Sequence, residues 1–247
     1  PKGSLRQFRP DDLAAHILSS AINKIPNLDP SQVEDVILGC AQPEMEQGLD
    51  VARVASLKAG LPVSIPGLTV NRFCASGLEA IAIAANRIQS GMADIIIAGG
   101  VESMSYVPFM GETLRPNPIL MSTKPDTYLG MGQCVEQLAA KFGIGRIESD
   151  EFAAHSHEKA LNAAAKGFFD NEIQPVKVTI SDTDSDGNTI TSRKVLSVDE
   201  GPREGTSTEV LGNLKKAFSE DGVITAGNAS QRSDGAAAVV VMSAKKA

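Results

Sequence analysis

The sequence is poor in the residues that build several common kinds of site. Among 247 residues it has no Trp, two Tyr, three His and three Cys. With so few aromatic residues, we expect no platform for stacking bases or sugars. The three cysteines, Cys40, Cys74 and Cys134, form no Cys-x-x-Cys pair, which argues against a zinc knuckle or a disulfide framework and favours a reducing, cytoplasmic compartment.

Long apolar runs and excess positive charge are missing too. No run reaches the roughly 18 apolar residues of a membrane span, and residues 1–6 lack the apolar stretch of a signal peptide. Lys and Arg number 23 against 30 Asp and Glu, for a net charge of −7. A nucleic acid or an anionic membrane is therefore not expected as a partner. A phosphate-bearing ligand would need a local basic patch.

The first hundred residues alternate between helix and strand patterns. Continuous apolar strands separated by helices predict an α/β fold with a mainly parallel sheet covered on both faces. In such sheets ligands bind beyond the carboxyl ends of the strands. Helices are predicted from Asp11-Asp12 to about Lys24, over 50–59 and over 78–90, and strands over 33–41, 67–71 and 94–98, the last closed by Gly99-Gly100.

The rest of the chain has a different pattern. Residues 103–145 are rich in Pro, Gly and Met and predict one short helix near 133–142, and a long irregular segment of this kind is usually functional. A helix from an N-cap at Ser149 to about Gly167 is followed by alternating runs that predict a hairpin. Together they predict a helix-plus-hairpin insertion in the α/β core. The hairpin runs are 176–180 and 189–198, and a buried-strand pattern returns at 235–242.

Cys74 stands out because it lies between a strand pattern at 65–70 and a helix pattern that starts at Leu78. A thiol at the first turn of a helix lies in the field of unpaired backbone N–H groups, which favours the nucleophilic thiolate. The small residues that follow it leave room for a substrate carbonyl. One helix terminus supplies only about 0.3–1 kcal/mol, so a basic partner such as histidine is expected nearby. The alternative is a buried structural thiol.

Two patterns resemble metal sites without fitting them. Residues 182–187 (DTDSDG) match the opening of a calcium loop, but the twelfth position, which needs a bidentate Glu, is Arg193. An Asp-Gly hairpin turn is the simpler interpretation. His155 and His157 are two residues apart on a predicted helix, so they point to opposite sides and cannot share a metal. With His16, they are predicted to face solvent.

Four ordered motifs across the whole chain resemble signatures of the thiolase family. The resemblance implies a thiolase-like layered fold, with an N-terminal α/β core domain over 1–103 and 232–247. A CoA-binding α+β loop domain over 104–231 is inserted in it, and the family's C-terminal half is not represented. The motifs are the acyl-accepting NRFCASGLEA at 71–80, AGGVESMS at 98–105, DEGPR at 199–203, and TAGNAS at 225–230 with SDGAAA at 233–238.

The same resemblance implies an acyltransferase. Cys74 would attack the ketone carbonyl of a 3-ketoacyl-CoA, acetyl-CoA would leave, and a second CoA would take the acyl group. The backbone N–H of Cys74 would help to hold the oxyanion. CoA is then a substrate, with no cofactor or metal implied. The resemblance also implies the CoA contacts. Arg203 would lie near the nucleotide, Phe218 against the adenine, and Met131, Ala226 and Ser230 along the pantetheine arm. Lys215 and Lys216 would supply local positive charge or, alternatively, form a solvated face.

Three functions remain open. Residues 104–111 favour a degradative 3-ketoacyl-CoA thiolase of fatty acid β-oxidation. The alternatives are a biosynthetic acetoacetyl-CoA thiolase, which runs the Claisen condensation, and a non-catalytic CoA-binding module. The family's Gly-His-Pro histidine, Asn-Glu-Ala-Phe motif and Cys-x-Gly cysteine are missing from this sequence, so the chain alone is expected to be inactive. Cys134 stands where relatives often have threonine.

Assembly is predicted from the same resemblance. We expect exposed apolar surface, because the family's second half would cover part of the sheet and of the site. Relatives dimerise through their N-terminal halves, so a homodimer or a dimer of dimers is the expected form. CoA and acyl-CoA are the expected small-molecule partners, and another β-oxidation enzyme is a possible protein partner.

Overall fold

A computed structural model of the chain describes residues 3–108 and 114–247. The chain forms two compact units. Unit 1 comprises Pro1–Thr113, Gln174–Leu196 and Ser233–Ala247, and unit 2 comprises Leu114–Ile173 and Ser197–Arg232. The domain boundaries expected from the sequence, 1–103 with 232–247 and 104–231, stay a prediction.

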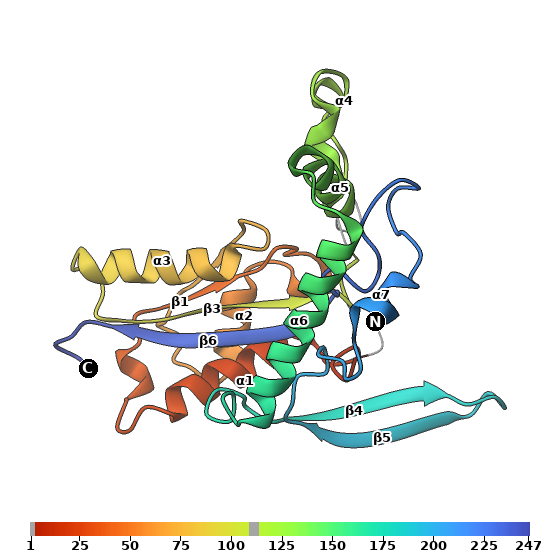
Figure 1. Cartoon of the computed structure of the whole chain (residues 1–247). Helices are drawn as coiled ribbons and strands as arrows, with labels where there is room; N and C mark the ends of the chain where they lie inside the picture. The colour runs from red at the N-terminus through yellow and green to blue at the C-terminus, as the bar shows by residue number, and fades with distance from the viewer. Residues whose placement is uncertain (1–2, 109–113) are drawn as a thin grey trace. The chain divides into compact units, whose positions relative to one another are not determined.

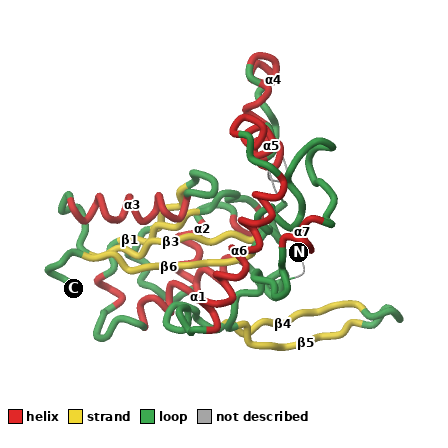
Figure 2. Tube along the Cα trace, viewed as in Figure 1, coloured by secondary structure: helices red, strands yellow, loops and turns green. Residues whose placement is uncertain are grey.

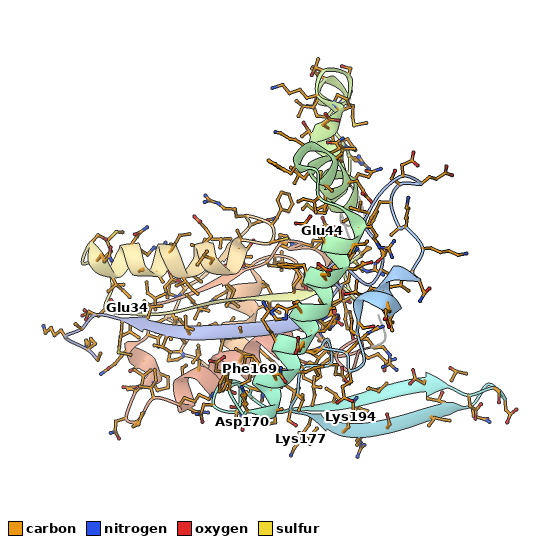
Figure 3. All side chains as sticks on the ribbon, viewed as in Figure 1. Glu34, Glu44, Phe169, Asp170, Lys177 and Lys194 are labelled. Atoms are coloured by element: carbon orange, nitrogen blue, oxygen red, sulfur yellow. The ribbon has the colours of Figure 1, made fainter. Side chains whose placement is uncertain are left out.

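Unit 1 is built on a four-stranded sheet in the order β2-β1-β3-β6 (Figure 1). β1 (Asp35–Gly39) pairs in parallel with both β2 (Gly67–Val70) and β3 (Ile95–Ser103). β6 (Asp234–Met242) pairs antiparallel with β3. The predicted mainly parallel sheet is therefore confirmed. Glu34, labelled in Figure 3, directly precedes β1. Its carboxylate accepts the backbone N–H of Ile95, the first residue of β3, at 3.1 Å.

Helices cover both faces of this sheet, as the sequence predicts. Successive side chains of a strand point to opposite faces. Val36 and Leu38 pack with residues of α1 (Pro10–Asn23) and α2 (Val51–Lys58), and Ile37 packs with residues of α3 (Ser76–Gln89). Figure 2 shows α3 and α1 on opposite sides of the strands. Short 3₁₀ helices at Pro30–Gln32 and Met45–Gln47 flank β1.

A hairpin completes unit 1. β4 (Val176–Thr183) pairs antiparallel with β5 (Thr189–Leu196), and alternate β4 side chains pack against Leu13 of α1. In its turn, the Asp184 carboxylate accepts the N–H groups of Asp186 and Asn188 at 3.0 and 2.8 Å. Gly187 has a φ of 85°, which favours glycine. The Asp-Gly hairpin interpretation of 182–187 is confirmed.

Unit 2 is mainly helical and is held by a buried carboxylate. Its elements are α4 (Pro118–Thr123), a 3₁₀ helix (Pro125–Tyr128), α5 (Met131–Phe142), α6 (Arg146–Ala165) and α7 (Thr208–Gly212). Asp150 is 1 % exposed. Its carboxylate accepts hydrogen bonds from the Arg146 guanidinium at 2.7 Å and from the Asn228 Nδ2 at 2.8 Å. Arg146 also donates to the Leu211 carbonyl at 2.6 Å, which ties α6 to α7.

Several element predictions are wrong in detail. Gly99 and Gly100 do not close β3, because their extended backbone pairs with β1 on one side and β6 on the other. Residues 103–145 hold more helix than the single one expected. Ser149 does not cap α6, which begins at Arg146 after an N-cap at Gly145, and its hydroxyl donates to the Gly145 carbonyl at 2.9 Å. Residues 109–111 of the branch-specific segment 104–111 lie outside the described residues.

Candidate active site

Cys74 lies in the turn between β2 and α3, at the edge of the sheet where the parallel strands end. Its side chain is exposed, whereas Cys40 is buried and Cys134 is intermediate. Ala75 is the N-cap of α3 and makes no side-chain capping bond. The turn therefore presents Cys74 to solvent immediately before the first turn of a helix, and the buried-thiol alternative for Cys74 is wrong.

The turn is shaped by side chains that bond to its own backbone. The Asn71 Oδ1 accepts the Phe73 N–H at 2.9 Å, and Phe73 adopts a φ of 47°. This left-handed conformation is uncommon for residues other than glycine and clusters at functional sites. The Ser76 hydroxyl accepts the Arg72 N–H at 2.8 Å and donates to the Phe73 carbonyl at 2.5 Å. These bonds end β2 and start α3 within a few residues.

Close packing fixes the start of α3 against the sheet. A Cβ on Gly39, the last residue of β1, would lie 2.3 Å from the Ser76 carbonyl carbon and 2.5 Å from the Gly77 nitrogen. A Cβ on Gly100 would lie 3.1 Å from the Gly39 oxygen and 3.6 Å from the Gly77 Cα. At Gly39 a Cβ would overlap backbone atoms, so that approach requires glycine, whereas at Gly100 it would be a tight contact. Gly39, which the sequence pattern did not single out, therefore lets the start of α3, and with it the turn that carries Cys74 (the nucleophile turn, named for the role proposed for Cys74), lie close to β1.

A polar cluster lies where β1 and β3 end. The Glu102 carboxylate accepts the Ala41 N–H at 2.6 Å, the Gln42 N–H at 3.3 Å and the Gln47 Nε2 at 2.8 Å. Cys40 is 1 % exposed beside this cluster, with its Sγ at 3.4 Å from Gln47 Nε2. Burial, and then the nearby Glu102 charge, raise the pKa of the Cys40 thiol to about 12. Cys40 is therefore a neutral structural thiol.

The histidines have other partners. His16 Nε2 lies 3.1 Å from the Pro175 carbonyl oxygen in unit 1. In unit 2, His155 pairs with Glu158 at 3.2 Å, and His157 Nδ1 accepts the Arg203 N–H at 3.1 Å. Only His155 is exposed, as predicted for all three. His16 and His157 are partly exposed, and each lies against a backbone group.

The residues predicted to contact CoA lie on the surface of unit 2. The ring of Phe218 covers the backbone at Gly132, next to Met131, so closely that a Cβ on Gly132 would lie 2.4 Å from it. Lys216 pairs with Thr225 in a β-bridge beside Ala226. The segments that carry Met131, Phe218 and Ala226 are therefore neighbours. All the side chains predicted to contact CoA are exposed: Met131, Arg203, Lys215, Lys216, Phe218, Ala226 and Ser230.

Polar contacts hold the loops of this surface. The Glu136 carboxylate on α5 accepts the N–H groups of Val223 and Ile224 at 2.8 and 3.0 Å. Asn228 Oδ1 accepts the Thr225 N–H at 2.7 Å. A shallow pocket of about 270 Å³ is lined by residues 216–220. Sequence reasoning missed Glu136, although an acidic residue in an otherwise apolar-faced helix is a usable signal.

The described part of the chain shows neither a metal centre nor a membrane-spanning helix. Residues 3–108 and 114–247 contain no group of three or more His, Cys, Asp or Glu placed to hold a metal ion. Over the same residues, every helix is too short or too polar to span a bilayer.

Comparison with known proteins matches the chain to one family model. Residues 1–245 match the model described as "Thiolase, N-terminal domain". The chain is 47 % identical over 246 residues to a 3-ketoacyl-CoA thiolase of Bacillus subtilis, covering 100 % of this chain and 63 % of that protein. It is 41 % identical over 261 residues to a β-ketoadipyl-CoA thiolase of Acinetobacter baylyi, covering 98 % and 62 %.

A solved structure agrees with this match. The crystal structure of the Bacillus anthracis acetyl-CoA acetyltransferase superposes with a TM-score of 0.81 at 36 % identity, covering 99 % of this chain and 62 % of that one. The chain thus spans less than two thirds of the length of these curated relatives.

Proposed function

Since the chain belongs to the thiolase family, we propose that it carries the nucleophile and the CoA-binding surface of a degradative 3-ketoacyl-CoA thiolase. The observation that carries the proposal is the exposed Cys74 held immediately before the first turn of α3 by a strained turn. A thiol so placed is accessible to a substrate and lies in the favourable field of the helix N–H groups.

The proposed reaction has two steps. The Cys74 thiolate adds to the ketone carbon of a 3-ketoacyl-CoA, and the carbon–carbon bond between that carbon and the next one toward the thioester breaks. The acyl group stays on sulfur as a thioester, and the released enolate takes a proton to become acetyl-CoA. A second CoA thiol, losing its proton, then attacks the acyl-cysteine and restores the thiolate. The Cys74 N–H is proposed as one donor to the oxyanion.

CoA is proposed to bind on unit 2. Phe218 is half exposed and offers a flat apolar face beside Met131, which suits an adenine ring. Arg203, Lys215 and Lys216 would supply positive charge for phosphates in a chain whose net charge is −7. Ala226 and Ser230 lie on the loop held by Asn228 and are proposed to line the pantetheine arm.

A CoA-binding experiment tests whether these residues form a CoA site or only a solvated surface. Calorimetric titration of the chain with CoA is expected to give saturable binding that Phe218→Ala weakens severalfold. Phe152→Ala is the matched control, because Phe152 is also an exposed aromatic residue of unit 2 and is expected to leave binding unchanged. Equal effects of the two substitutions would refute the proposed adenine contact.

Turnover tests the reaction itself. In the whole protein, 3-ketoacyl-CoA thiolysis is expected to be lost in Cys74→Ala and retained in Cys134→Ala, with an acyl group on Cys74 found by peptide mass mapping. The chain alone, lacking the Gly-His-Pro histidine, is expected to show little turnover. A preference for long substrates would support the degradative branch, and one for acetoacetyl-CoA the biosynthetic one. CoA binding without any turnover by the whole protein would favour a non-catalytic module.

We also propose a cytoplasmic homodimer, or a dimer of dimers, that works with another β-oxidation enzyme. The support is the large apolar side chains that unit 1 leaves in solvent: Leu49 is 95 % exposed and Val63 77 %. Such surface favours association. Sedimentation of the chain as a stable monomer at all concentrations would argue against the dimer.

A further inference from the structure

We propose that Glu102 is a positioning residue for Cys74, acting through the end of β1 and the side chain of Asn71. Glu102 is outside the nucleophile turn, so its effect on Cys74 must pass through other residues. The inference rests on the proposed role of Cys74 as nucleophile. It assigns a purpose to a carboxylate that the proposed reaction does not use.

The first link joins Glu102 to the segment that follows β1. Its Oε2 accepts the Ala41 N–H at 2.6 Å, and its Oε1 accepts the Gln42 N–H at 3.3 Å. Gln47, which is fully buried, donates to the same Oε1 at 2.8 Å and accepts the Ser103 N–H. Hydrogen bonds to a carboxylate are stronger than neutral ones. The path of residues 41 and 42 is therefore fixed by the carboxylate at the end of β3.

The second link joins this segment to the nucleophile turn. The Ala41 carbonyl oxygen accepts the Asn71 Nδ2 at 3.0 Å, and the Oδ1 of the same amide accepts the Phe73 N–H at 2.9 Å. One side chain thus bonds the end of β1 and the residue before Cys74. Phe73 holds a φ of 47°. A strained conformation of this kind persists only where its surroundings impose it.

The chemistry of the cluster explains why a carboxylate is needed. Glu102 lies in β3 between Val101 and Ser103, which are both buried. Three N–H donors converge on its two oxygens. An amide in its place would offer one oxygen and turn an NH₂ group toward a donor, so at least one of the three bonds would be lost. Glu102→Gln is therefore the matched substitution that breaks the link while keeping size and shape.

The test is the rate of Cys74 alkylation by limiting iodoacetamide at neutral pH, read by peptide mass mapping of the chain. Glu102→Gln is expected to slow Cys74 about two- to fivefold, the range that the field of one helix terminus can supply. Asn71→Ala, at an exposed position, is expected to slow it by the same factor. Because both act through one link, the double variant is expected to be no slower than either single one.

Asp35→Asn is the control for a general loss of stability. Asp35 is a buried carboxylate at the opposite end of β1, paired with Arg87. Its substitution is expected to lower the urea midpoint without changing the Cys74 rate. The same slowing of Cys74 in Asp35→Asn and in Glu102→Gln would mean that only stability is being sensed, and the inference would fall.

Other outcomes also decide the matter. If the two substitutions slow Cys74 independently, so that their effects multiply in the double variant, the link through Asn71 is overturned. An unchanged Cys74 rate in Asn71→Ala would overturn it too. That single variant tests the link even if Glu102→Gln fails to fold. An unchanged Cys74 rate in folded Glu102→Gln would leave Glu102 with a structural role only. A wild-type Cys74 that reacts no faster than free cysteine would also overturn the inference, because there would be no activation for Glu102 to support. The nucleophile role itself is tested separately, by the loss of thiolysis in Cys74→Ala of the whole protein.

Discussion

Cys40 and Cys74 follow neighbouring parallel strands of one sheet and have opposite environments. Cys40 comes directly after β1, is 1 % exposed, and has a thiol whose pKa is raised to about 12 by burial and by the Glu102 charge. Cys74 comes after β2 and is exposed. The carboxyl edge of a parallel sheet thus does not by itself make a thiol available. Whether the thiol is exposed depends on the segment that follows each strand.

Those two segments differ in where their hydrogen bonds go. After β1, the N–H groups of Ala41 and Gln42 bond to Glu102, and the Cys40 thiol is buried beside the same carboxylate. After β2, Asn71 and Ser76 bond mainly to the backbone of their own turn and direct the chain into α3, and the one bond to another segment is from the Asn71 Nδ2 to the Ala41 carbonyl. A turn closed by its own side chains leaves its central residue free to face solvent.

The largest expected effect is on alkylation. The rise in the Cys40 pKa from 9.0 to about 12 lowers its thiolate fraction about a thousandfold at neutral pH. We therefore expect Cys74 to be alkylated by iodoacetamide at least about a thousandfold faster than Cys40 in the folded chain. Peptide mass mapping over time measures the ratio. In urea the two rates should converge, and similar rates in the folded chain would break the comparison.

A second prediction concerns Gly39, which precedes Cys40 and touches the start of α3. Gly39→Ala would place a Cβ within 2.5 Å of backbone atoms, so we expect a loss of about 3 kcal/mol in the free energy of unfolding. Gly235→Ala is the matched control in β6, where an added Cβ meets nothing within 4 Å. Urea unfolding measures both. Equal stabilities would show that α3 does not pack on β1 as described.

The smallest effect is a pH dependence caused by Cys40. Its folded pKa is raised, so the neutral thiol contributes stability that is fully present below pH 9.0 and is lost as pH rises toward about 12. Between pH 8 and pH 10, wild type should lose about 1.4 kcal/mol more than Cys40→Ala. Urea unfolding at each pH gives the two slopes, and parallel slopes would mean that Cys40 ionises freely in the folded state.

The sequence by itself determined the class of fold and the identity of the nucleophile candidate. Apolar strands such as Ile95–Ile97, separated by helices of matching period, leave few options other than a covered parallel sheet. The same local signals failed at boundaries. Gly99 and Gly100 resemble a strand end, but pairing with β6, which is remote in sequence, keeps them in the strand.

Only the tertiary structure decided how the two thiols differ, because the deciding contacts join residues far apart in the chain. Glu102 bonds to Ala41, and Gly39 of β1 lies against Gly77 at the start of α3. In the sequence Cys40 and Cys74 both simply follow a strand. The exposure of each thiol depends on which segments pack against it. Those segments are distant in the sequence, so the local pattern around a cysteine does not identify them.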